Sequence, residues 1–134
     1  MTLTERIFVL RGVPGFDQLR EEDLLAVAAS MTERRYGPAE VVVLAGASMW
    51  HLLVVVGGAI HARDSARRQP PVVGADLLLT NRSATLTLTA DPQEGAVCLR
   101  MSKGHFFTVV NECPALLVEM IRLHVIGHGE EGAR

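Results

Sequence analysis

The 134-residue chain lacks several features that would narrow its function at once. It has two cysteines, Cys98 and Cys113, which form no short-spaced pair and sit among apolar residues. We therefore expect buried free thiols in a reducing compartment, and not a disulfide or a metal site. No apolar run approaches the ~20 residues that a membrane span needs, and residues 1–11 lack the apolar core of a signal peptide. These absences predict a cytoplasmic protein without a membrane span.

The chain also has no large excess of either positive or negative charge. The net charge is −2, and the tightest basic pairs are Arg67–Arg68 and Arg34–Arg35. We expect both pairs to lie in solvated loops or at helix ends, and we expect no nucleic-acid partner, because nothing provides a basic field. The single lysine against twelve arginines is typical of a GC-rich bacterial genome. The length fits one domain, residues 1–134.

Signals for catalysis are missing as well. No glycine pattern matches a phosphate-cradling loop of the Gly-x-Gly-x-x-Gly or Walker kinds. His51, His61 and His105 have no local Ser, Cys or Asp partner that resembles a nucleophile relay. His124 and His128 are four residues apart, but we attribute them to the dipole at a helix C-terminus and not to a metal. The sequence predicts no enzyme, no catalytic or metal-ligating residue, and no cofactor.

The hydrophobic pattern divides the chain into three parts. The first part has apolar residues at helical spacing, the middle part has short β-branched or alternating runs between glycine turns, and the last part is helical again. These parts are N-terminal helices at about 2–32, a β-region at about 36–101 and C-terminal helices at about 103–128. Within the β-region the expected strands are residues 41–44, 52–56, 60–62, 85–89 and 96–101.

This order of elements predicts an α+β fold. We expect an antiparallel β-roll, similar to a double-stranded β-helix or jelly roll, with an N-terminal helix and two C-terminal helices packed on it. The last helix, which begins near Pro114, has an apolar face wider than one contact needs. We therefore expect a protein partner or a homodimer through this C-terminal helix. Its apolar face comprises Leu116, Leu117, Met120, Ile121, His124 and Val125, widened by Val118, Leu123 and Ile126.

Several residues, taken in their order, resemble the cyclic-nucleotide-binding domain family, which includes the sensor domains of catabolite-type regulators, kinase regulatory subunits and gated channels. Val13–Leu19 is similar to the family's entry segment, and Tyr36–Val42 to a turn that usually reads Pro-Gly-Glu, with Ala39 in place of the glycine. Further matches are the turn glycines Gly46 and Gly58, the aromatic residue Phe106 and the proline Pro114. The resemblance covers roughly residues 7–126 and implies a β-roll with a regulatory role.

Gly74–Thr85 resembles the family's phosphate-binding cassette. The resemblance implies that Arg82 pairs the cyclic phosphate of cAMP or cGMP, because a buried phosphate needs a guanidinium. The start of the cassette departs from the pattern: Ala75 stands where a ribose-binding glutamate is expected, and Asp76 comes one place late. The segment is also about two residues short, and Asn81 replaces the common proline. The implied ligand-binding residues are Gly74, Asp76, Arg82, Ser83, Ala84 and Thr85.

Other roles for these residues stay open. Arg82 could cap the sheet or pair with Asp76 or Glu40, and Asp76 could be a helix N-cap or a turn residue. Thr85 could lie on the solvent face of a strand. We expect Trp50 to be a packing anchor. The sequence thus favours a regulatory domain that senses cAMP or cGMP through a partly degenerate cassette; the alternative is a binding-dead dimerisation or docking module of the same fold, or a fragment of a larger protein.

Overall fold

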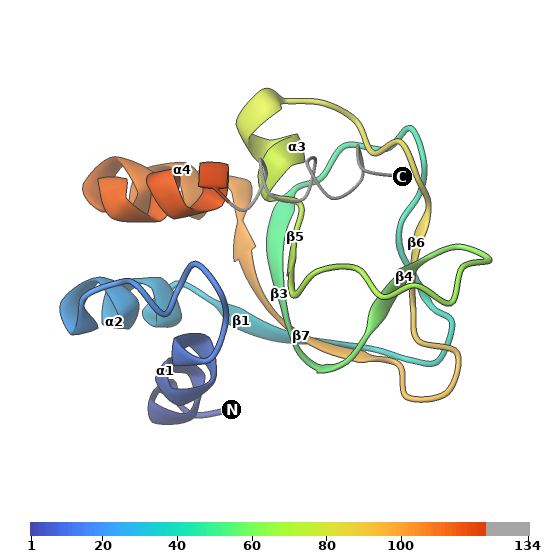
Figure 1. Ribbon diagram of the computed structural model, residues 1–134, viewed down its shortest axis with the longest axis horizontal. Helices are drawn as coiled ribbons and strands as arrows, with labels where there is room; N and C mark the ends of the chain where they lie inside the picture. Colours follow the sequence, from blue (N-terminus) through green and yellow to red (C-terminus); the bar gives the residue numbers. More distant parts are fainter. Residues whose placement is uncertain (123–134) are drawn as a thin grey trace. The chain divides into compact units, whose positions relative to one another are not determined.

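The computed structural model describes residues 1–122 (Figure 1). Residues 123–134 fall outside the described part, and with them the expectations for Leu123, His124, Val125, Ile126 and His128. The chain forms two compact units: one contains residues 1–30 and those from Gly104 onward, and the other contains residues 31–103. Each unit is described by itself below.

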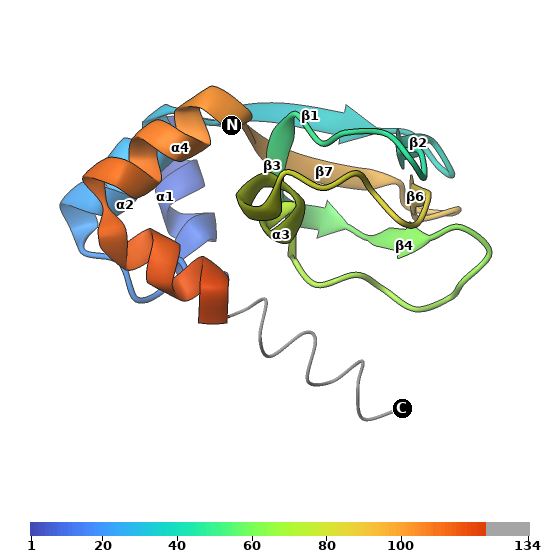
Figure 2. The ribbon, with the colours of Figure 1, turned by 90° about the horizontal axis from the view of Figure 1, so that it is seen from above.

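The unit of residues 31–103 is built from antiparallel strands in two sheets. The four-stranded sheet has the order β1-β7-β3-β5, and the three-stranded sheet has the order β2-β6-β4. Strand β3 leads directly into β4, so the two sheets follow one another along the roll (Figures 1 and 2). The predicted α+β class and antiparallel β-roll are confirmed. The strands are β1 Thr32–Tyr36, β2 Val41–Val43, β3 His51–Gly58, β4 Ile60–Ala62, β5 Val72–Val73, β6 Leu88–Ala90 and β7 Ala96–Ser102.

The centre of this unit is the pair of strands β3 and β7. Leu52, Leu53 and Val54 are consecutive and all buried, which is why their sequence reads as an unbroken apolar run. In β7, Cys98 pairs with Val55; it is a buried free thiol, as predicted, and burial raises its pKa to about 11. The pairing shifts register between Val55 and Gly57, where a bulge bends β3 on its way into β4.

Strand β1 corrects the expectation for Arg34 and Arg35. Both arginines lie in a strand that begins at Thr32, four residues before the predicted start, and not in a loop or at a helix end. β1 is an edge strand with β7 as its one neighbour, so its other side can carry charge. Arg34 forms an ion pair with Glu40 at 2.9 Å, and its guanidinium lies over the ring of Tyr36.

Strand β6 is shorter than the alternation in Thr85–Thr89 predicts. It begins only at Leu88, and Leu86 is exposed. The reason lies in the preceding residues, whose backbone pairs with a different partner: Ala84 donates to Ala47 O and accepts from Gly46 N. The hydroxyl of Thr87 also makes a contact outside the strand ladder, since it accepts the backbone N–H of Ala45.

The helical unit contains α1 Leu3–Arg11, α2 Glu21–Ala29, α4 Lys103–Glu112 and a further helical segment at residues 114–122. The boundary between the units falls after Lys103, the first residue of α4. Figure 2 shows α1, α2 and α4 grouped together. Phe16, in the turn between α1 and α2, is fully buried, as is Phe106 in α4. The other free thiol, Cys113, donates to Asp23 Oδ1 at 3.4 Å. Within residues 1–122, no helix combines the length and apolar character that crossing a bilayer requires.

Candidate phosphate-binding segment

The cassette-like segment starts where β5 ends. Gly74 has a φ of 97° and precedes α3, Ala75–Thr80. A Cβ on Gly74 would lie 2.7 Å from Met49 Cε and 3.3 Å from the carbonyl oxygen of His51. Glycine is therefore required at position 74 for two reasons: the backbone is left-handed, and the neighbouring atoms leave no room for a Cβ. The short helix α3 has no side-chain cap at its start, so Asp76 is not the helix N-cap; it is the second residue of the helix and is half-buried.

The end of α3 is closed by Asn81. Asn81 has a φ of 55°, and the backbone N–H of Arg82 donates to the carbonyl of Leu77 at 3.2 Å. Proline cannot adopt this φ, so the proline that the resemblance implies at this position could not form the turn that Asn81 forms. The side chain of Asn81 accepts a hydrogen bond from Lys103 Nζ at 2.9 Å. The segment thus leaves the helix through a fixed left-handed turn.

Arg82 is exposed, and within residues 1–122 its side chain forms no ion pair. Neither predicted partner is used. Glu40 is occupied elsewhere, since its carboxylate accepts from Arg34 and from the backbone N–H of Gly37 at 2.9 Å. These two bonds hold the pKa of Glu40 below its ordinary value, the backbone bond from Gly37 being the larger cause. The guanidinium of Arg82 is therefore accessible to a ligand.

The residues after Arg82 are only partly accessible. Ser83 forms an isolated bridge with Ser48 and is exposed, as is Thr85. Ala84 is buried, and its backbone N–H donates to Ala47 O at 2.8 Å. This N–H is thus already used within the fold. Of the predicted ligand residues, the structure leaves Arg82, Ser83 and Thr85 on the surface and places Gly74 and Ala84 inside.

Trp50 is not the packing anchor that we expected. Its side chain is 65% exposed, and Lys103 Nζ lies 5.7 Å from its ring centre. The backbone explains the exposure: Trp50 precedes β3, and its carbonyl accepts the N–H of Lys103 at 2.8 Å, so the residue is fixed at the rim of the sheet. Burial cannot be read from residue type alone, because large aromatic residues also occur at rims.

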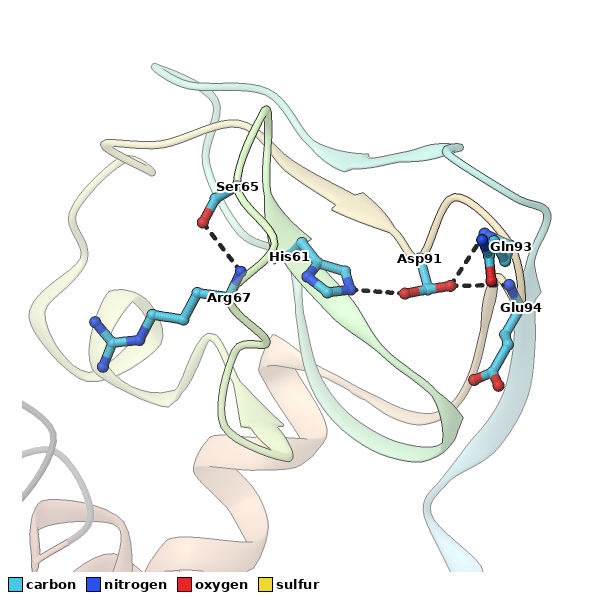
Figure 3. A network of polar contacts seen from close by, with 6 residues as sticks. All are labelled: His61, Ser65, Arg67, Asp91, Gln93 and Glu94. Atoms are coloured by element: carbon cyan, nitrogen blue, oxygen red, sulfur yellow. Dashed lines mark hydrogen bonds and ion pairs between the residues drawn. The ribbon is translucent and has the colours of Figure 1, made fainter.

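A second polar group was missed by the sequence analysis. His61, in β4, binds Asp91 at 2.8 Å between Nε2 and Oδ1 (Figure 3). The two residues are thirty positions apart, so a search for local partners cannot find the pair. No local signal in the sequence marks the pair, because it is the pairing of β4 with β6 that brings Asp91, which directly follows β6, beside His61. Backbone N–H groups of Glu94 and Gln93, and then His61, lower the pKa of Asp91 to about 2.

Comparison with solved structures identifies the fold. The regulatory domain of Toxoplasma gondii PKA with cAMP aligns with a TM-score of 0.68 at 20% identity over 83% of this chain. The regulatory subunit of a cAMP-independent protein kinase A from Trypanosoma brucei aligns with 0.75 at 16% over 90%. The catabolite activator protein of Thermus thermophilus aligns with 0.74 at 18% over 90%.

The chain has the cyclic-nucleotide-binding fold. The resemblance inferred from the sequence is therefore confirmed at the level of the fold. No protein-family model and no curated protein sequence matches the chain. The alignments cover 45% of the Toxoplasma and Trypanosoma proteins and 60% of the Thermus protein, so the chain spans about half the length of these relatives by structure.

Proposed function

We propose that this chain is a regulatory domain that binds the phosphate of a cyclic nucleotide, cAMP or cGMP, at Arg82. The observation that carries the proposal is the state of Arg82: it is exposed and free of any carboxylate within residues 1–122, in the segment that follows Gly74 and α3. A guanidinium pairs a phosphate with two parallel hydrogen bonds, which is the geometry that such a ligand needs.

The comparisons support this proposal in a limited way. The Toxoplasma domain is described with cAMP, whereas the Trypanosoma protein is described as cAMP-independent. A mutant of the Trypanosoma protein, with three substitutions of which one introduces an arginine, is described as bound to cAMP in its A site. The fold therefore occurs in proteins with and without cAMP dependence. Whether this chain binds cAMP depends on the residues of its cassette-like segment. This chain already has its arginine at position 82.

We expect weak binding. Ala75 provides no carboxylate for a ribose hydroxyl, and the loss of one charge-assisted hydrogen bond costs about 1.5–3 kcal/mol, or roughly one to two orders of magnitude in affinity. The backbone N–H of Ala84 would have to leave Ala47 O before it could serve a ligand. Asp76 is one methylene shorter than glutamate and sits one residue further into α3.

A thermal-shift assay tests the proposal. Millimolar cAMP or cGMP should raise the melting temperature of the unmutated chain, because a ligand that binds only the folded state stabilises it. Arg82→Glu should abolish the rise. Arg63→Glu is the matched control, since Arg63 is also an exposed arginine in a loop of the same unit, and it should keep the rise. A rise of equal size in Arg82→Glu would contradict the role of Arg82.

A second candidate function is a docking or dimerisation module that binds no nucleotide. Residues 114–122 favour it, because Leu116 and Met120 are fully buried while Val118 and Ile121 are 54% and 49% exposed. Two adjacent exposed branched residues on one helical segment are suited to a protein partner, here a second copy of the chain.

Light scattering separates the two candidates. The docking module predicts a dimer that Ile121→Asp converts to a monomer, whereas Leu44→Asp, a change at an exposed apolar residue in the other unit, leaves it intact. A monomer at high concentration would argue against the docking module. A dimer that survives Ile121→Asp would place the contact elsewhere.

A further inference from the structure

We propose that a pocket between β4 and the Asp91–Gly95 turn is a second binding site, which takes a small oxyanion through Arg68. The pocket has a volume of about 280 Å³ and shares no residue with Gly74–Thr85. Pockets for drug-sized ligands are about 300–1,000 Å³, so a hollow of about 280 Å³ suits a smaller group such as a single oxyanion. It is lined by His61, Ser65, Ala66, Arg68, Asp91, Pro92 and Gln93.

The two walls of the pocket are held by the His61–Asp91 pair. Figure 3 shows His61 between the loop that carries Ser65 and Arg67 on one side and Asp91 on the other. His61 is 6% exposed, and its bond to Asp91 of 2.8 Å joins the β4 wall to the wall formed by the turn. Within residues 1–122, Nδ1 of His61 has no hydrogen-bond partner, so this one bond fixes the ring. The width of the pocket is therefore set before any ligand arrives.

The loop over His61 is also ordered by its own hydrogen bonds. Ser65 N–H donates to Ala62 O at 3.1 Å, and the hydroxyl of Ser65 accepts from Arg67 N–H at 3.1 Å. Arg68 pairs with His61 as an antiparallel bridge, which holds its backbone beside β4. A preformed site loses less conformational entropy on binding than a flexible loop does.

The donors around the pocket favour an anion. The Arg68 guanidinium makes no ion pair within residues 1–122, and the Ser65 hydroxyl, which accepts from Arg67, still has its own proton to donate. The one carboxylate in the lining, Asp91, stays ionised at neutral pH because its pKa is lowered to about 2, but the hydrogen bonds that it accepts offset part of its charge. Its two oxygens already meet His61 and the backbone N–H groups of Gln93 and Glu94. A carboxylate or a phosphate would pair Arg68 in the usual two-bond geometry.

NMR titration of the full chain with inorganic phosphate and with acetate tests this site. The protein carries Arg82→Ala, so that failure here leaves the proposed nucleotide site untouched and success cannot come from Arg82. We expect saturable shifts at the amides of Ser65, Arg68 and Gln93 in the millimolar range, absent with chloride at equal ionic strength. Binding of acetate as well as phosphate would assign the site to oxyanions in general, and binding of phosphate alone would assign it to phosphate compounds.

Two variants localise the contact. Arg68→Gln should weaken binding by about tenfold or more, because it removes a charge-assisted pair. Arg67→Gln, next to it on the same loop but outside the lining, should change the affinity by less than about twofold. Both side chains are exposed, so neither change endangers folding. Shifts that chloride reproduces, shifts that survive Arg68→Gln, or no saturable shift at all would overturn the proposal.

Discussion

At the scale of single residues, Ala39 holds a backbone conformation that suits glycine better. Its φ is 61°, in a turn where Ala39 N–H donates to Asp91 O. A non-glycine residue in this region costs roughly 1–2 kcal/mol, partly offset by the greater unfolded-state entropy of glycine. We predict that Ala39→Gly stabilises the chain by about 1 kcal/mol in urea denaturation. Ala45→Gly, at an exposed alanine without a positive φ, should destabilise it instead, and a stabilising Ala45→Gly would contradict this explanation.

Asp91 should make stability depend on pH in the acid range. Its pKa falls from 3.8 to about 2 on folding, chiefly through the backbone N–H groups of Glu94 and Gln93 and then through His61. A lowered carboxyl pKa contributes stability above the unfolded value, and that contribution disappears as the pH falls through the folded value. The advantage of the unmutated chain over Asp91→Asn in free energy of unfolding should therefore shrink as the pH falls from 3.8 to about 2. A difference that stays constant over this range would contradict the assignment.

The residue scale also limits what the sequence can predict of the site. Arg82 and Gly74 could be named as ligand candidates from a local pattern, because a glycine, a short helix and an arginine follow one another along the chain. His61 and Asp91 could not, because strand pairing brings them together. The use of the Ala84 N–H by Ala47 likewise depends on a contact between distant segments. Local motifs predict ligand candidates, but they do not predict which donors the fold has already used.

At the scale of elements, the turn between β3 and β4 depends on Gly58. A Cβ there would overlap the carbonyl oxygen of Gly95 and lie 2.9 Å from its carbonyl carbon, both backbone atoms that cannot move aside. We predict that Gly58→Ala destabilises the chain by about 3 kcal/mol or more, from overlap and from a φ of 64°. Urea denaturation measures the loss.

Gly46→Ala is the matched control for Gly58. Gly46 also has a positive φ, 88°, but a Cβ at this position would meet nothing within 4 Å. Only the backbone cost of about 1 kcal/mol should appear. Equal losses in the two variants would show that backbone conformation alone, and not the approach of Gly95, makes glycine necessary at position 58.

The apolar strands β2, β3, β4 and β7 were predicted from the sequence, two of them edge strands, whereas the charged edge strand β1 and the two-residue strand β5 were not. β3, β4 and β7 were expected within a few residues, since their apolar runs must be removed from water. β1 was missed because an edge strand can carry Glu33, Arg34 and Arg35 without cost. β6 was predicted too long because alternation in Thr85–Thr89 indicates a half-buried strand whether or not a neighbouring strand is in register.

For the whole molecule, the order of elements together with a few turn and packing residues predicted the fold, although identity to the solved structures is only 14–20%. The constraint lies in the sequence of turns and apolar runs, which a β-roll reproduces with many different residues. Ligand binding does not follow from the fold in the same way, since one structural relative is described with cAMP and another as cAMP-independent. The account therefore depends on Arg82.

Titration calorimetry of the purified chain with cAMP and cGMP tests that claim most directly. The account predicts saturable heat at high micromolar to millimolar ligand, lost in Arg82→Ala and retained in Arg63→Ala. Weak binding is expected because Ala75 provides no carboxylate. Heat that Arg82→Ala leaves unchanged, or no heat at millimolar ligand, would contradict the account and leave the docking module as the better explanation of this domain.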